Sequence, residues 1–251
     1  MKKKTSRIGV QNESTIHAQL KKRYHRKGSK SETLVGRYVV DVDRGDGEII
    51  EIQTRGFVKL RKKLDFLLKT HRVRLVYPLT LEKELVFRHP ETGHIENHRK
   101  SPKKSRLVDI ARELTGIVEI LNRPGFTLEV VFTKEREIRC RDGRGSWRRR
   151  GTSIVDRELV EVKGRVRLVK KVDYLRALLP QGAPDRFTNR ELAEYMDIPM
   201  HTAQEITYCL RRLGLLDSDS KKGNARVFHV KLYRFVPKQA GEHRHNGQAG
   251  V

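Results

Sequence analysis

The sequence predicts an α/β fold followed by a smaller unit of helices and a hairpin. Helix-like and strand-like apolar patterns alternate between residues 14 and 77, and three short helical patterns dominate after residue 172. The 251 residues include 55 Lys and Arg against 31 Asp and Glu, a net charge of +24. A chain of this length fits two modest domains at about 100–200 residues each. We therefore expect a basic tail at 1–12, an α/β domain at 13–170 with its core at 13–78 and an extension at 79–170, a second domain at 171–236 and a disordered tail at 237–251.

The composition excludes several classes of protein. The sequence has no run of 18 or more apolar residues, so no membrane-spanning helix is expected. The basic start Met1–Lys4 lacks the apolar stretch of a secretory signal. Cys140 and Cys209 are too few for a disulfide framework or a structural zinc site. We therefore expect a cytoplasmic protein without a membrane partner. We expect it to be nucleoid-associated, because so basic a surface releases counterions when it binds a polyanion such as DNA.

The first 78 residues justify the α/β prediction element by element. Ile16, Leu20 and Tyr24 recur every four residues, which predicts a helix from an N-cap at Ser14 to residue 24. Strand patterns at 34–43 and 48–54 flank the turn signal at 44–47 and form a hairpin. An apolar stripe predicts a helix at 56–69, and the apolar run 73–77 predicts a strand that Pro78 ends.

The remaining elements are predicted in the same way, with weaker signals before residue 170. Between 79 and 170 we expect strands at 83–88, 127–139, 153–162 and 164–170, a helix at 105–121 and a basic loop at 98–104. After it, helices are expected at 172–179, 188–196 and 200–213, and a hairpin at 215–229. Trp147 is followed by three arginines. We favour a partly buried Trp that anchors a basic strand, and stacking on a nucleic-acid base is the alternative.

The hairpin brings carboxylates together. If Gly47 closes a three-residue loop, Arg44 lies opposite Glu48 and Asp41 lies opposite Glu51. One face of the hairpin then carries Asp41, Asp43, Glu51 and Gln53, and the other carries Val40, Val42, Ile50 and Ile52 and should pack on the helix at 56–69. Directly opposed carboxylates repel each other unless a cation lies between them, and oxygen ligands suit Mg²⁺ or Mn²⁺. The alternative is a polar strand face exposed to solvent.

These residues resemble a known family. Val39-Val40-Asp41 and Ile49-Ile50-Glu51-Ile52-Gln53, set between two helices and followed by an apolar strand, are similar to the core of the PD-(D/E)xK restriction-endonuclease-like superfamily over residues 13–78. The resemblance implies a mixed sheet flanked by helices and phosphodiester hydrolysis that depends on a divalent metal. The implied catalytic residues are Asp41, Glu51 and Gln53, and the implied metal ligands are Asp41, Glu51 and the carbonyl of Ile52.

The chain departs from that family at Gln53, which stands where the family has Lys. A Gln side chain can orient a water molecule by hydrogen bonds but brings no charge. Lys59 or Lys62 from the following helix could supply the charge instead. Asp43 lies on the same hairpin face as Asp41 and Glu51 and is a further accessory residue. Many members also carry a Glu on the first helix, and Glu13 stands just before it.

The last third of the chain contains Glu191-Leu192-Ala193, then Ile198-Pro199, then Leu210-Arg211-Arg212-Leu213-Gly214-Leu215-Leu216. This succession resembles winged helix-turn-helix domains. Thr188 and Glu191 form a capping box, and Gly214 follows the third predicted helix. The resemblance implies that this helix enters the major groove of DNA and that a basic wing contacts phosphates. The implied DNA-binding residues are His201, Thr202, Gln204, Tyr208 and Arg212 on the helix and Lys221, Lys222 and Arg226 on the wing. Glu205 would repel phosphates and favours the alternative that the domain binds protein.

We therefore predict a divalent-metal-dependent DNA endonuclease that uses Mg²⁺ or Mn²⁺ and acts on double-stranded DNA through its C-terminal domain. A homodimer is plausible, because cutting both strands requires two active sites. The alternative is a DNA-binding regulator or structural protein with an inactive core, and RNA is a third possible partner.

Overall fold

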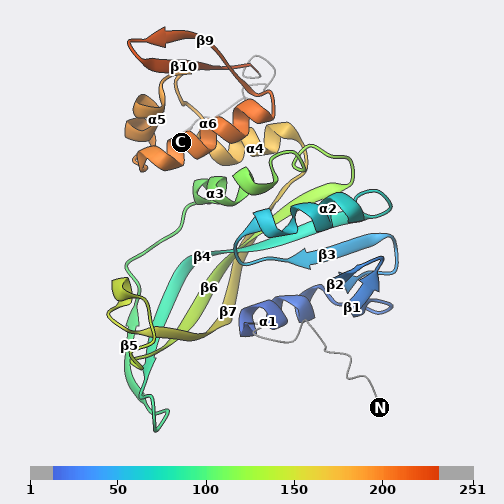
Figure 1. Cartoon of the computed structure of the whole chain (residues 1–251), viewed down its shortest axis with the longest axis vertical. Helices are drawn as coiled ribbons and strands as arrows, with labels where there is room; N and C mark the ends of the chain where they lie inside the picture. Colours follow the sequence, from blue (N-terminus) through green and yellow to red (C-terminus); the bar gives the residue numbers. More distant parts are fainter. Residues whose placement is uncertain (1–13, 232–251) are drawn as a thin grey trace, which may run out of the picture.

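A large mixed sheet runs through the molecule, and helices cover both of its faces (Figure 1). The computed structural model describes residues 14–231. The strand order is β1-β2-β3-β4-β6-β7, and β5 also pairs with β4. β4 runs parallel to β3 and β6, and the other pairs are antiparallel. The strands are β1 (Lys30–Val35), β2 (Tyr38–Asp43), β3 (Glu48–Ile52), β4 (Arg72–Arg88), β5 (Ile95–Lys100), β6 (Phe126–Cys140) and β7 (Ser153–Leu168).

Two cores lie on the two faces of the sheet. Helix α1 (Thr15–Tyr24) packs on one face against Val42, Ile50 and Ile52. On the other face, α2 (Arg61–Leu67), preceded by the 3₁₀ turn Phe57–Leu60, packs against Ile49 and the next strands. The prediction that the apolar face packs on the helix at 56–69 was therefore wrong: of its four residues, only Val40 belongs to the core on the α2 side. A helix therefore packs against each face of the hairpin.

The hairpin register is as predicted. Val42 pairs with Ile50 and Asp43 with Ile49, and the backbone N–H of Arg44 donates to the carbonyl of Glu48 at 3.0 Å. The strand predicted at 34–43 is instead two strands, because the chain turns at Gly36, where φ is +59°. A Cβ at this position would overlap the ring of Phe66, so both the turn and the packing favour glycine.

Strand β4 continues past Pro78, which corrects the prediction that this residue ends it. The backbone N–H of Arg72 donates to the carbonyl of Gly47, just before β3, and that of Val73 donates to the carbonyl of Gly125, just before β6. The backbone N–H groups of even-numbered residues in this part of β4 therefore point toward β3. The last such bond joins the N–H of Gln53 to the carbonyl of Val76. Pro78 faces the position beyond the end of β3, where no ladder bond is needed, so its missing N–H costs nothing there.

Beyond this point β4, β5, β6 and β7 form a long projection, seen at the lower left of Figure 1. The basic loop predicted at 98–104 begins inside β5, which pairs with β4 through Val86 and His98. The two strands predicted after residue 153 are the single strand β7, with a shift in register beside Gly164. The predicted helix at 105–121 is a series of short helical turns: the 3₁₀ turn Leu107–Ile110, α3 (Ala111–Leu114) and the 3₁₀ turn Thr115–Ile117.

The last third contains three helices and a three-stranded sheet of order β8-β10-β9. Its elements are α4 (Lys171–Leu178), β8 (Arg186–Phe187), α5 (Asn189–Met196), α6 (Met200–Arg212), β9 (Leu216–Lys222) and β10 (Ala225–Val230). The capping box at Thr188 and Glu191 is confirmed, and Gly214 after α6 has a left-handed backbone, where φ is +73°. Within residues 14–231 no helix is long and apolar enough to cross a membrane.

Candidate functional site

Asp41 and Glu51 lie where β2 and β3 diverge. The ladder of paired residues between β2 and β3 ends at Val42 and Ile50, and Asp41 and Glu51 are the next residues on the two strands. The backbone N–H of Ile52 donates to Asp41 Oδ2 at 2.7 Å, and the backbone N–H of Asp41 donates to Glu51 Oε1 at 3.3 Å. Each carboxylate thus accepts a bond from the strand opposite, which holds both of them in the opening between the strands.

Two further side chains reach this opening from the two helices that cover the sheet. From α1, His17 Nε2 lies 2.9 Å from the carbonyl oxygen of Ile52 and 3.3 Å from Asp41 Oδ2. Since a carbonyl oxygen only accepts hydrogen bonds, His17 carries a proton on Nε2. From α2, Lys63 forms an ion pair with Glu51 Oε2. The Lys63 side chain is 14% exposed and that of Glu51 is 3% exposed, so this is a largely buried ion pair.

The environment drives the two carboxyl groups apart in pKa. Burial raises the pKa of Glu51 to about 7, against the attraction of Lys63 and with a further contribution from the charge of Asp41. Burial alone would also raise the pKa of Asp41, but the hydrogen bond from His17 and the backbone N–H of Ile52 hold it below its usual range. At mildly acidic pH, Asp41 is therefore ionised while Glu51 holds a proton.

Helix α1, which carries His17, is fixed at both ends by side chains from distant strands. At its N-terminus, Asp156 of β7 accepts hydrogen bonds from the backbone N–H and the hydroxyl of Thr15. Ser14 occupies the predicted N-cap position but makes no capping bond through its side chain. At the C-terminus, the hydroxyl of Tyr24 donates to the buried carboxylate of Glu129 at 2.5 Å.

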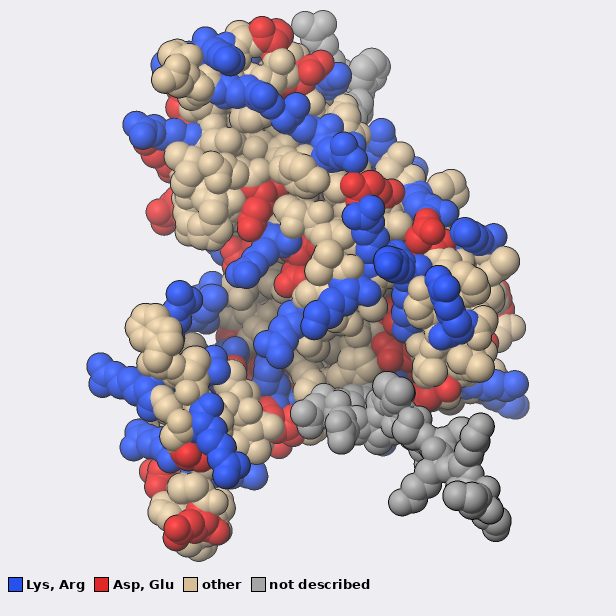
Figure 2. Space-filling view, in the orientation of Figure 1, with Lys and Arg blue, Asp and Glu red and all other residues tan. Residues whose placement is uncertain are grey.

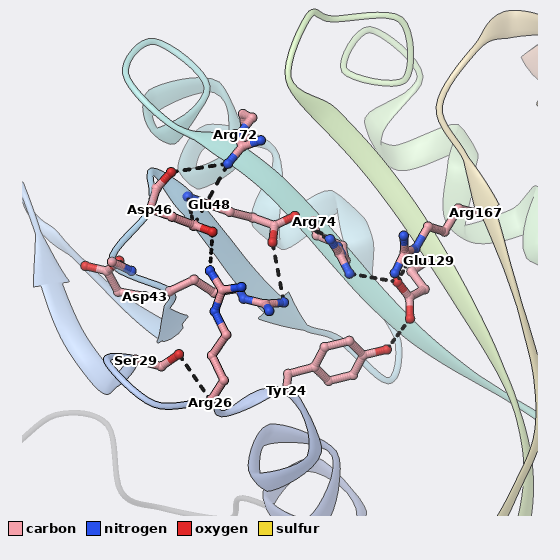
Figure 3. A network of polar contacts seen from close by, with 12 residues as sticks. Tyr24, Arg26, Ser29, Asp43, Asp46, Glu48, Arg72, Arg74, Glu129 and Arg167 are labelled. Carbon is pink, nitrogen blue, oxygen red and sulfur yellow. Dashed lines mark hydrogen bonds and ion pairs between the residues drawn. The ribbon is translucent and has the colours of Figure 1, made fainter.

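Figure 3 shows the network around Glu129, which joins α1 to four strands. Arg74 of β4 and Arg167 of β7 donate to Glu129 at 3.2 and 2.8 Å, and Arg74 also binds Glu48 of β3. Burial acts to raise the pKa of Glu129, but the hydrogen bond from Tyr24 and the charges of these arginines outweigh it and keep the pKa below its usual value. The network positions α1, and so His17, on the sheet.

The oxygen atoms of this site are of the type that a hard divalent cation prefers. Asp41 Oδ1 has no hydrogen bond among those of the described residues, and the Ile52 carbonyl keeps a lone pair beside the bond from His17. The donor set therefore fits a cation held by two carboxylates and one main-chain oxygen. Within residues 14–231 no group of three or more His, Cys, Asp or Glu side chains is arranged to hold a metal.

Other residues predicted for this site lie away from it. The side-chain amide of Gln53 donates to the carbonyl of Arg55 at 2.5 Å, so it is engaged beyond the end of β3. Asp43 accepts from the backbone N–H of Gly45 and stabilises the turn. Lys59 and Lys62 are exposed, and the lysine that contacts Glu51 is Lys63. Glu13 lies outside the described residues.

Helix α6 and the β9–β10 hairpin form a second polar surface. Gln204, Tyr208 and Arg211 lie one helical turn apart, and with Arg226 of β10 they line one shallow groove. Arg211, Arg226 and Lys221 line a neighbouring one. Arg211 was not among the residues predicted for this surface, although its spacing of seven residues from Gln204 places it on the same face of the helix.

The placement of the other predicted residues on this surface is mixed. His201, Lys221 and Lys222 are exposed, although Lys222 forms an ion pair with Glu191 at 2.8 Å. Thr202 does not point outward as predicted: it is 7% exposed because it belongs to the face of α6 that packs inside the molecule. Arg212 is exposed but donates to Glu119 at 3.2 Å, away from the groove.

Comparison with known proteins places the chain in a family. No solved structure matches it. An uncharacterized protein of Treponema pallidum (strain Nichols) is 32% identical over 231 residues, which cover 92% of this chain and 88% of that protein. This match extends through the C-terminal helices and hairpin. The family model described as "Domain of unknown function (DUF8091)" matches residues 14–169, which include α1, the carboxylate site and the whole large sheet, and the chain belongs to that family.

Proposed function

We propose that the chain is a divalent-metal-dependent DNA endonuclease whose active site is formed by Asp41, Glu51, the Ile52 carbonyl, His17 and Lys63. The observation that carries this proposal is the position of Lys63. Its ammonium group lies against Glu51, and it supplies from α2 the positive charge that Gln53, just after β3, does not supply.

Each residue of the site has a role that follows from its contacts. Asp41 and Glu51, with the Ile52 carbonyl, would hold Mg²⁺ or Mn²⁺, which when bound supplies a Lewis acid and lowers the pKa of a water molecule. Lys63 stabilises negative charge that develops on the scissile phosphate. His17 orients Asp41 and the Ile52 carbonyl by donating to them from α1. Glu51, with its raised pKa, can hold or release a proton near neutral pH.

The C-terminal unit would bind duplex DNA as a winged helix. Its order of helices and strands and the three-stranded sheet β8-β10-β9 support this proposal. The exposed face of α6 would contact the bases through Gln204, Tyr208 and Arg211, and Arg226 and Lys221 would contact phosphates. Figure 2 shows Lys and Arg side chains spread over this unit and over the lower-left projection of the large sheet, with a hollow between the two.

A cleavage assay with paired variants tests the proposal. We expect the wild-type chain to cut duplex DNA with Mg²⁺ or Mn²⁺ and not with EDTA. Asp41→Asn and Glu51→Gln should lower the rate at least about 10³-fold, because each removes a charged ligand. Lys63→Met should lower it about 10²- to 10³-fold through the loss of charge stabilisation.

Matched controls lie next to these residues. Asp43→Asn makes the same change on the same strand as Asp41→Asn, and Lys62→Met makes the same change on the same helix as Lys63→Met. Both should cut at close to the wild-type rate. If Asp41→Asn and Glu51→Gln cut as fast as their controls, this site is not the active site.

A second function is favoured by one observation. The ion pair between Lys63 and Glu51 neutralises the buried carboxylate without any metal, as a purely structural pair would. The chain would then be a non-catalytic DNA-binding protein. In that case the wild-type chain binds duplex DNA, no metal supports cleavage, and Lys63→Met lowers stability without changing any activity.

A further inference from the structure

The outer end of the sheet projection carries an exposed aromatic side chain among arginines. Residues 139–150 read RCRDGRGSWRRR, with six arginines and one acidic residue, Asp142. Trp147 is 82% exposed, which corrects the favoured prediction of a partly buried anchor. An indole so exposed gains little from core packing, and its ring is accessible to a ligand.

The loop that carries Trp147 is held in shape by its own hydrogen bonds. The N–H of Gly145 donates to Gly151 O at 3.0 Å, and the N–H of Thr152 donates to Arg149 O at 3.0 Å. A Cβ at Gly145 would overlap the carbonyl of Thr152, so the two sides of the loop touch. These bonds fix the backbone of the loop, including the 3₁₀ turn Trp147–Arg149 that carries the indole.

The cationic groups nearby are also held in place. The Arg148 guanidinium lies 5.5 Å from the centre of the Trp147 ring. Below the loop, Arg99, Arg139 and Arg141 lie over the ring of Phe87 at 5.9, 5.9 and 5.4 Å. Arg139 is engaged by Glu137, whereas Arg99 and Arg141 form no ion pair among those of the described residues, and guanidinium N–H donors match phosphate oxygens.

Two acidic side chains of the outer projection are neutralised inside it, whereas Glu91 and Glu96 of the β4–β5 hairpin are exposed. Glu137 binds Lys83 and Arg139, and Glu84 binds Lys134 at 2.7 Å. The arginines at the tip thus outnumber the free acidic groups, and a polyanion is the partner of matching charge. A nucleotide base can stack on an exposed indole only if the face of the base is free. Unpaired nucleotides have such a free face, whereas bases inside a duplex are covered by the neighbouring base pairs.

We infer that this outer end, defined by Trp147, Arg148, Arg99 and Arg141, is a binding site for single-stranded nucleic acid. One unpaired base stacks on Trp147 and the arginines bind the neighbouring phosphates. This inference concerns binding alone and goes beyond the proposed cleavage of duplex DNA, because it needs neither the metal nor the carboxylates.

The fluorescence of the protein offers a direct test, because Trp147 is the one tryptophan in the sequence. Oligo(dT) added to the full chain in EDTA at low salt should quench this fluorescence to saturation, and a duplex of the same length should quench it far less. The affinity measured by quenching should fall as salt rises, with a slope of about −0.7 per phosphate contacted. Absence of quenching by oligo(dT) overturns the inference.

Labelled oligonucleotides and variants give the second test. In fluorescence anisotropy, Trp147→Ala should weaken binding of oligo(dT) by about 5- to 150-fold, and Trp147→Phe should restore most of the affinity. Arg211→Ala on α6 should weaken binding of duplex DNA and leave oligo(dT) unchanged. If Trp147→Ala weakens both ligands equally, or neither, the site is not specific for single strands. Asp41→Asn should bind oligo(dT) like wild type, so failure of the cleavage proposal is distinguishable from failure of this one.

Discussion

Glu51 and Asp41 are chemically similar residues with opposite environments. Glu51 is buried and faces an ammonium group, whereas Asp41 accepts hydrogen bonds from a backbone N–H and from His17. Burial raises the pKa of Glu51 to about 7 while the partners of Asp41 lower its pKa. Pairs of groups driven apart in this way are characteristic of sites that bind metals or transfer protons.

The raised pKa of Glu51 predicts how metal binding depends on pH. A carboxylate must be ionised to act as a ligand, so the affinity for Mn²⁺ should rise as the pH increases through about 7. Without metal, Glu51 makes the stability of the fold change with pH in the opposite direction. The pKa of Glu51 is higher in the folded state than its ordinary value of 4.5, so the free energy of unfolding falls as the pH rises from 4.5 to about 7.

Titration of the chain with Mn²⁺, followed by electron paramagnetic resonance at several pH values, measures this dependence. Glu51→Gln should bind Mn²⁺ weakly and without the step near neutral pH, and Asp43→Asn should keep the step. An affinity that stays constant across neutral pH in the wild-type chain would contradict the assignment of Glu51 as a ligand.

At the scale of elements, turn and capping residues correctly predicted the features that depend only on residues nearby in the sequence. Gly47 fixed the hairpin register that brings Asp41 opposite Glu51, and Thr188 with Glu191 marked the start of α5. The site residues supplied by other elements were not predictable in this way. Lys63 was one of several basic residues on its helix, and only the packing of α2 on the sheet selects it over Lys62.

The course of β4 shows the same limit. Pro78 ends a strand when its missing N–H would face a partner, and this depends on where the neighbouring strand stops. The neighbouring strand β3 ends at Ile52. The residues around Pro78 contain no sequence signal that shows where β3 ends or how it pairs with β4. The sequence therefore predicted that strands exist on either side of residue 78, and not that they are one strand.

The N-terminus of α1 provides a prediction at this scale. Asp156 accepts two hydrogen bonds from Thr15, whereas Ser14 makes no capping bond through its side chain. Asp156→Ala should therefore lower the free energy of unfolding by about 1 kcal/mol, within the range of about 0.5–2 for loss of a cap. Ser14→Ala should change it by less than about 0.5 kcal/mol. Urea denaturation measures both, and an equal cost for the two variants would show that Asp156 is not the cap.

At the scale of the whole molecule, the C-terminal unit is continuous with the body of the protein. One buried cluster extends from Ile49 in the sheet through Leu114 of α3 to Ile206 of α6. The thiol of Cys209 lies 3.7 Å from the carbonyl of Ala111, and the Arg106 guanidinium donates to two carbonyls in the turn between α5 and α6. One face of α6 is therefore fixed against α3, which leaves only the opposite face free to contact a ligand.

This continuity predicts that the C-terminal unit does not open separately. Cys209 is fully buried, and in a Cys140→Ser chain it is the one remaining thiol, so its reaction with a thiol reagent reports opening around α6. We expect the free energy of opening, from labelling rates at increasing urea, to approach the free energy of global unfolding from circular dichroism. If the unit were an independent domain, Cys209 would react at urea concentrations that leave the large sheet folded. A rigid connection would instead fix the groove on α6 relative to the carboxylate site, and under the proposed function this would hold DNA bound at the groove at a constant distance from the carboxylates.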